Sequence, residues 1–142
     1  MKIVINCIPP KHTAQASNKI LKTKDGKLFV GKMSSSRGKQ TQNELMWLLM
    51  PYRPQKPYDC PIKLSVKWLY PFRKAEPKKN RIEELPCVTR PDCDNLCKLL
   101  LDIMTRLGFW VDDSTIYNLE FTKAYSENPR IEINIEKVID NK

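Results

Sequence analysis

The chain is organised around one stretch, Arg90-Pro91-Asp92-Cys93-Asp94-Asn95-Leu96-Cys97-Lys98. It leads into a helix predicted over residues 95–107, where Leu and Ile recur at i, i+3, i+4, i+7 and i+11 and form a core-facing stripe. Gly108 is suited to end this helix. Because Pro91 biases its predecessor away from helix, residues 90–94 are predicted to be extended, which places Asp92 and Asp94 on one face.

Two carboxylates on one face repel each other unless a cation lies between them. Mg²⁺ prefers carboxylate oxygens and keeps several of its waters. Capping of the following helix is the alternative role for one of the two aspartates. Capping does not explain both, so the pair Asp92 and Asp94 predicts a divalent-metal site for cutting nucleic acid.

A second acidic pair, Asp112-Asp113, follows the predicted helix and is the natural source of a further ligand. Spacing alone does not choose between its two members. Lys98 lies in a row of side chains of alternating charge along the helix. Each oppositely charged pair in this row would stabilise the helix by a few tenths of a kcal/mol. It also lies one turn from the first acids, where its ammonium could contact the scissile phosphate. Both roles are compatible.

The flanking segments predict an α+β fold, with a small mixed sheet of four to six strands and two packed helices. Alternation over residues 62–70 predicts a half-buried strand with lysines on its outer face. Further predicted elements are a strand over residues 2–8, a helix over residues 40–50 with a core-forming apolar cluster, and a C-terminal hairpin of residues 115–125 and 130–136 with Ile131, Ile133 and Ile135 inward. At 142 residues, the chain 1–142 is predicted to form a single domain.

The charge distribution favours a polyanionic partner, usually nucleic acid. Residues 1–111 carry 21 Lys and Arg against 9 Asp and Glu, whereas residues 112–142 carry 4 against 7. Two predicted basic loops, residues 11–39 and 71–81, hold much of the excess. In the first, Asp25-Gly26 could turn a short hairpin ending at residues 28–30. Otherwise this loop is a DNA-contacting arm or a solvated segment.

Several classes of protein are excluded by the composition. The five cysteines include no CxxC, and the single histidine lies far from them in sequence, which argues against a disulfide scaffold and a zinc site. The N-terminus is too quickly interrupted for a signal peptide, and no apolar run could span a membrane. We therefore expect a reduced cytoplasmic protein without a membrane partner.

The pattern D-x-D-N-L-x-K, followed by Gly108-Phe109-Trp110-Val111 and the second acidic pair, resembles the RusA family of Holliday junction resolvases over roughly residues 88–137. The resemblance implies a RusA-like, homodimeric, Mg²⁺- or Mn²⁺-dependent crossover junction endodeoxyribonuclease of DNA recombination and repair, often phage-related. Such enzymes act on branched DNA and nick two strands of a four-way junction symmetrically.

By motif position, the resemblance implies that Asp92, Asp94 and Asp113 are the catalytic, metal-binding acids and that Lys98 is the important lysine. Asp112 takes the less critical place in its pair. The best-studied form has a basic residue where this chain has Pro91, and Arg90 can substitute from one position away. The predicted DNA-binding residues are basic or lie in the motif: Arg73, Lys74, Lys78, Lys79, Arg81, Arg90 and Asn95. The alternatives are a broader branched- or flap-DNA nuclease and a non-catalytic DNA-binding protein.

Overall fold

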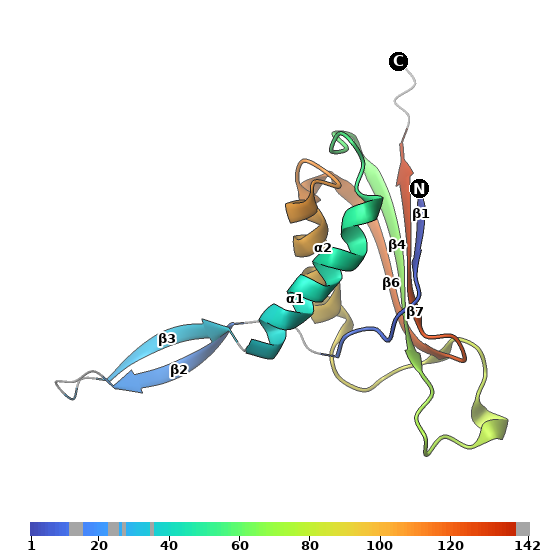
Figure 1. Ribbon diagram of the computed structural model, residues 1–142, viewed down its shortest axis with the longest axis horizontal. Helices are drawn as coiled ribbons and strands as arrows, with labels where there is room; N and C mark the ends of the chain where they lie inside the picture. Colours follow the sequence, from blue (N-terminus) through green and yellow to red (C-terminus); the bar gives the residue numbers. More distant parts are fainter. Residues whose placement is uncertain (12–15, 23–25, 27, 35, 139–142) are drawn as a thin grey trace.

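The central element of the fold is a five-stranded sheet in the order β1-β7-β4-β6-β5. The computed structural model describes residues 1–11, 16–22, 26, 28–34 and 36–138. Two helices lie on one face of this sheet, which Figure 1 shows on edge. The strands of the sheet are β1 (Lys2–Ile5), β4 (Ile62–Pro71), β5 (Leu85–Pro86), β6 (Ile116–Ser126) and β7 (Arg130–Lys137). The helices are α1 (Ser36–Leu49) and α2 (Cys93–Leu107), with short 3-10 turns η1 (Met50–Tyr52), η2 (Lys78–Asn80) and η3 (Asp113–Thr115). The α+β class and the two packed helices are confirmed.

Strand β4 is the middle of the core, as its alternation predicts. Its side chains facing the helices are at most 3% exposed: Ile62, Leu64, Val66, Trp68 and Tyr70. The inward isoleucines of β7 and the apolar stripe of α2 are also buried, so both predictions are confirmed. Burial of this surface is the main stabilising term of the fold.

The predicted C-terminal hairpin is wrong, although both of its strands form. Strand β4 lies between β6 and β7, so that Val66 is opposite Phe121 in parallel β6 and opposite Ile133 in antiparallel β7. Closeness in sequence favours a hairpin, but β4 is the more apolar partner for both strands, and burial outweighs the shorter loop.

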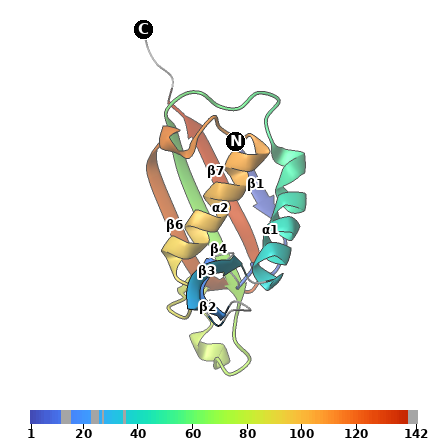
Figure 2. The ribbon, with the colours of Figure 1, turned by 90° about the vertical axis from the view of Figure 1, so that its left-hand side faces the viewer.

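Helix α2 is the crossover that joins the parallel strands β4 and β6, and Figure 2 shows it running diagonally over the sheet beside α1. It ends as predicted, with Gly108 at φ +83°, a left-handed conformation that glycine adopts without steric cost. It begins at Cys93, so the prediction that residues 90–94 are all extended is wrong. Asp92 (φ −72°, ψ 150°) is extended, whereas Cys93 and Asp94 lie in the first helical turn.

The N-terminal region differs from the prediction mainly in the bounds of its elements. Strand β1 ends at Ile5. The hairpin that the basic segment 11–39 could form is present as a separate antiparallel pair, β2 (Ala16–Lys22) with β3 (Leu28–Ser34), which is longer than the short hairpin predicted and extends away from the sheet in Figure 1. Its predicted turn residue Asp25 lies outside the described residues. The helix predicted from residue 40 begins at Ser36.

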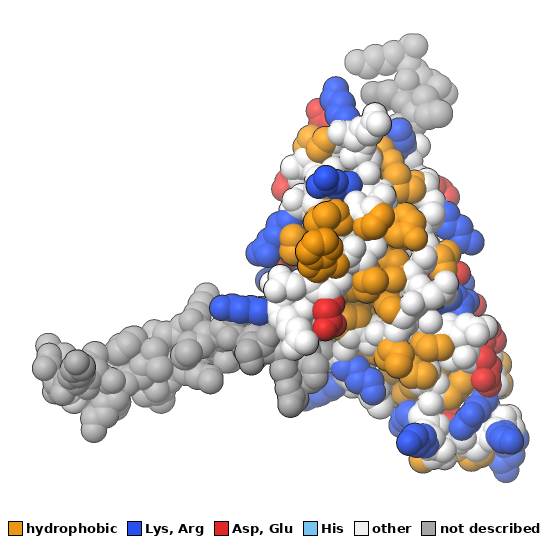
Figure 3. All heavy atoms as spheres, viewed as in Figure 1, with side chains coloured by type: hydrophobic (Ala, Val, Ile, Leu, Met, Phe, Trp, Pro, Cys, Tyr) orange, Lys and Arg blue, Asp and Glu red, His pale blue; other side chains and the backbone are white. Residues whose placement is uncertain are grey.

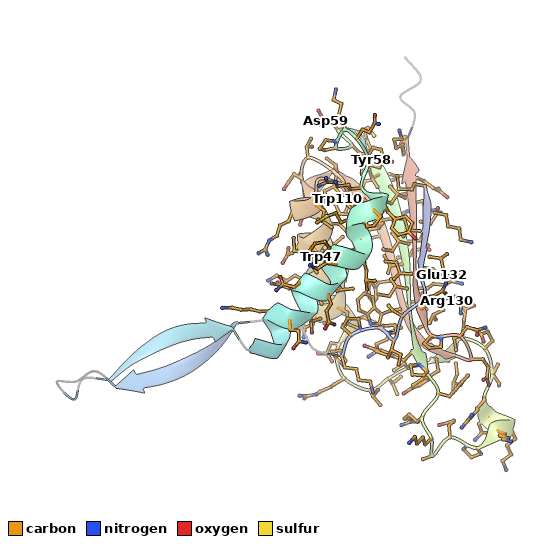
Figure 4. All side chains as sticks on the ribbon, in the orientation of Figure 1. Trp47, Tyr58, Asp59, Trp110, Arg130 and Glu132 are labelled. Atoms are coloured by element: carbon orange, nitrogen blue, oxygen red, sulfur yellow. The ribbon has the colours of Figure 1, made fainter. Side chains whose placement is uncertain are left out.

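The apolar cluster of α1 is only partly core. Leu45 and Leu49 are fully buried, whereas Trp47 is 73% exposed and Leu48 is 40% exposed. Trp47 projects away from the sheet in the stick view, and hydrophobic side chains gather over α1 on the face shown in Figure 3. None of the described helices has the length and apolarity needed to cross a membrane.

Candidate active site

The first two candidate acids lie at the start of α2 and are exposed to solvent. Asp92 occupies the N-cap position, yet its side chain makes no capping hydrogen bond. Capping therefore does not account for Asp92, and its carboxylate is available to a ligand. Asp94 follows in the first turn, where the positive end of the helix dipole favours negative charge. The two acids share this end of α2, although not in the predicted extended geometry.

Asp113 lies at the other end of α2, in the η3 turn that precedes β6. A helix of 15 residues is about 22 Å long. Because α2 crosses over between the neighbouring parallel strands β4 and β6, its two ends lie near opposite ends of these strands. Among the described residues, no three His, Cys, Asp or Glu side chains are close enough to hold one metal ion. A single chain therefore separates the acids that the sequence places in one site.

The structure distinguishes Asp112 from Asp113, which spacing does not. Asp112 caps the η3 turn, because its Oδ2 accepts a hydrogen bond of 3.2 Å from the backbone N–H of Ser114. Hydrogen bonding by Ser114 lowers the pKa of the Asp112 carboxyl below its ordinary value. Asp112 thus has a structural role, and the exposed Asp113 remains for a ligand.

Lys98 lies one turn beyond Asp94 and is exposed. The predicted charge row continues through Asp102 and Arg106, but none of the four ion pairs formed by the described residues involves this row. The ammonium of Lys98 is therefore not neutralised by a neighbouring carboxylate and can approach a phosphate.

A basic cavity of about 330 Å³ adjoins the start of α2. Its lining brings together Asp92, Arg90 and Asn95, which the sequence predicts to act at one place, with Pro91 and Lys11. Lys11 comes from the end of the segment after β1. Two cations beside a carboxylate suit a phosphate backbone, because Lys and Arg contact phosphate oxygens while an acid binds a cation.

The predicted DNA-contacting loop 71–81 divides into two kinds of basic residue. Arg73 pairs with Glu76 at 3.1 Å, and Arg81 donates a hydrogen bond of 3.2 Å to the Glu76 carbonyl, so both arginines order the loop. In contrast, the three lysines in this loop are exposed, and their side chains form no ion pair with the described residues: Lys74, Lys78 and Lys79. These lysines are the ones suited to contact DNA.

Lys123 is a functional residue that the sequence does not single out. It lies on β6, and its ammonium donates hydrogen bonds to the backbone carbonyls of Thr89 and Pro91, the latter at 2.7 Å. These carbonyls precede Asp92, so Lys123 fixes the chain that delivers the first acid. Nothing in its sequence context distinguishes it from an outward-facing strand lysine, because the contact joins residues more than 30 positions apart.

Replacing Lys123 with methionine should loosen this segment, because it leaves two carbonyls without their charged donor. We expect the free energy of unfolding to fall by about 1–3 kcal/mol. DNA cleavage well below the melting temperature should fall about tenfold, with partial rescue by Lys123→Arg. Urea denaturation and single-turnover cleavage measure the two effects. Lys56→Met, which removes the same charge from an exposed position in a connector, is the matched control, and equal cleavage by both variants would contradict a positioning role.

Comparison with known proteins identifies relatives that share this motif region. The family model described as Endodeoxyribonuclease RusA matches residues 7–136. The crossover junction endodeoxyribonuclease rusA of Lactococcus phage r1t is 42% identical over 88 residues, which is 58% of this chain and 63% of that protein. The uncharacterized protein YqaN of Bacillus subtilis (strain 168) is 34% identical over 93 residues, 61% of this chain and 65% of the relative.

A third relative, the crossover junction endodeoxyribonuclease RusA of Escherichia coli (strain K12), is 36% identical over 66 residues, 45% of this chain and 55% of that protein. The chain thus spans less than two thirds of the length of each of these relatives.

Proposed function

This chain is a member of the RusA endodeoxyribonuclease family, and on that premise we propose that it resolves four-way DNA junctions by paired symmetric nicks. The observation that carries the proposal is the start of α2, where two exposed acids adjoin a cavity lined by Lys11 and Arg90. Phosphodiester hydrolysis requires carboxylates that bind a cation beside Lys and Arg side chains that bind phosphate. The names of the relatives support a branched DNA substrate.

The donor set fits a hard divalent cation, Mg²⁺ or Mn²⁺, held by Asp92, Asp94 and Asp113. All three are exposed carboxylates, which such ions prefer. When bound, the ion supplies an activated water and stabilises the charge that develops on the phosphate. Lys98 would stabilise the same charge electrostatically, while Lys11 and Arg90 would hold the DNA backbone.

Because the acids lie at opposite ends of α2, we propose that each metal site is built from two copies of the chain. A two-fold axis beside α2 would set two such helices antiparallel, so that the Asp92 end of one meets the Asp113 end of the other. The resulting homodimer has two identical sites, which suits two symmetric nicks. One chain alone would then lack a complete site, in agreement with the separation of its acids.

The exposed edge of β6 is a suitable dimer surface. Strand β5 pairs only with Ala124 and Tyr125, and within the described residues the outer edge of β6 from Ile116 to Thr122 has no paired strand. Tyr117 and Leu119 on this segment are 61% and 43% exposed. An unpaired apolar edge favours pairing with another strand, and a two-fold pairing of β6 with its copy would bring the two α2 helices side by side.

A cleavage assay tests the proposed function directly. Purified protein with Mg²⁺ should introduce paired nicks at symmetric positions in a synthetic four-way junction. It should leave a matched linear duplex uncut and become inactive in EDTA. Binding without cutting in any divalent metal would favour a non-catalytic DNA-binding protein, and equal cutting of flaps and junctions would favour a broader branched-DNA nuclease.

A further inference from the structure

A second cavity, of about 160 Å³, lies beside the basic cavity and is not used by the mechanism above. Protein interiors are close-packed, and one liquid water occupies about 30 Å³, so this space is larger than a packing defect. Its walls are of two kinds: the rings of Tyr70, Phe72 and Tyr125, and the cationic groups of Lys11, Arg73 and Arg90. Within the described part of the chain, no acidic residue lines it.

The aromatic wall is held in place by contacts around it. The hydroxyl of Tyr70 donates a hydrogen bond of 2.8 Å to the Pro10 carbonyl, and burial raises the pKa of Tyr70 to about 12, which keeps this donor protonated. Phe72 stacks on Tyr125 with ring centroids 6.0 Å apart and planes 21° apart. Tyr70 and Tyr125 are only 3% and 6% exposed, so a ligand would mainly meet the half-buried ring of Phe72, which is already ordered.

Cations lie against these rings. The guanidinium of Arg73 lies 5.6 Å from the centre of the Tyr125 ring, and the ammonium of Lys11 lies 5.9 Å from that of Tyr70. Aromatic faces with interleaved Lys and Arg are the surfaces on which single-stranded nucleic acid binds, because rings stack on bases while cations hold the backbone. The absence of an acidic lining residue in the described structure agrees with an anionic ligand.

The two cavities share Lys11 and Arg90, so the aromatic cavity is next to the one that Asp92 lines. A DNA strand whose phosphate lies at Asp92 would place an adjacent nucleotide at the aromatic cavity. Bases within a duplex are paired and stacked, and their extrusion costs a few kcal/mol, whereas the cost is least for a base that is already unpaired. The branch point of a junction is where such a base is available.

We propose that the aromatic cavity binds one unpaired nucleotide displaced at the branch point, next to the scissile phosphate. The base would pack against the half-buried ring of Phe72, and its phosphate would lie between Lys11 and Arg90. This inference rests on the proposed function, since the cavity selects the branched DNA that the acids then cut. The aromatic cavity would then account for part of the protein's preference for binding junction DNA over duplex DNA.

Abasic substitutions test the proposal. Four-way junctions that each carry one abasic nucleotide near the branch point are bound to the Asp94→Asn protein, which is expected to bind without cutting. At one position, loss of the base should weaken binding about 5- to 100-fold. The Phe72→Leu variant should bind the intact junction more weakly by a similar factor and should no longer respond to the abasic substitution. Tyr52→Leu, which removes an exposed ring away from both cavities, should respond as the parent protein does.

A cavity-filling variant keeps the test independent of changes in the core. Thr89 is exposed and lines the aromatic cavity, so Thr89→Phe should block it and remove the response to the abasic nucleotide. Equal sensitivity in parent and pocket variants, or no sensitive position at all, overturns the pocket while leaving junction cleavage untouched. A parent protein that binds no junction would refute the proposed function, and the pocket with it.

Discussion

Replacing Asp94 with asparagine should abolish cleavage of a four-way junction while leaving binding at least as tight as that of the native protein. Asp94 is exposed in the first turn of α2, so asparagine fits without repacking. In the proposed site the change would remove a cation ligand and should lower the rate by at least about 100- to 1000-fold, since a metal ion supplies several kcal/mol of transition-state stabilisation. It also removes a negative charge facing the DNA backbone, which is why affinity should not fall.

The measurements are cleavage of labelled junctions in Mg²⁺ and fluorescence anisotropy of the same junctions. Asp102→Asn is the matched control, because Asp102 is an exposed acid two turns farther along the same helix and its substitution changes the charge equally. This control should cleave at close to the native rate. Either residual cleavage above a tenth of the native rate, or lost binding by a folded Asp94→Asn protein, would argue against Asp94 as a metal ligand.

Elements whose sequence pattern is local are predicted well. The stripe of α2, its end at Gly108 and the alternation of β4 each depend on neighbouring residues, and all three are confirmed. Strand pairing depends on residues far apart, so the insertion of β4 between β6 and β7 is not visible in the sequence. The start of α2 was missed because the effect of Pro91 on its predecessor was extended to the residues after it.

The same division holds for the candidate site. Asp92, Asp94 and Lys98 are recognisable as candidates because their spacing is short, whereas the choice of Asp113 over Asp112 rests on the family resemblance. The hydrogen bonds of Lys123 to the segment before Asp92 join residues more than 30 positions apart, and the aromatic cavity is lined by residues from distant segments. Only folding brings these residues together. The distance between the two ends of α2 is the clearest case, because it follows from a helix length that the sequence did predict. The proposal that follows from it, a site shared between two chains, depends on the crossover, which only the fold reveals.

A mixture of Asp94→Asn and Asp113→Asn proteins should regain cleavage that neither protein shows alone. In a heterodimer with shared sites, one site receives both substitutions and the other receives neither. Each heterodimer therefore keeps one of its two sites, so the purified heterodimer should hold about half of the native number of intact sites. Because each heterodimer has one active site, the product should be a single nick and not paired nicks.

The matched control is a mixture of Asp92→Asn with Asp94→Asn. These two acids lie at the same end of α2, so every site of every dimer carries a substitution and no cleavage should return. The two proteins, carrying different tags, are co-expressed and the heterodimer is purified before assay with Mg²⁺. If Asp113 served the acids of its own chain, each heterodimer site would hold one substitution and the first mixture would also stay inactive. Recovery in the first mixture alone therefore requires that one copy of the chain supplies Asp113 to the Asp92 and Asp94 of the other.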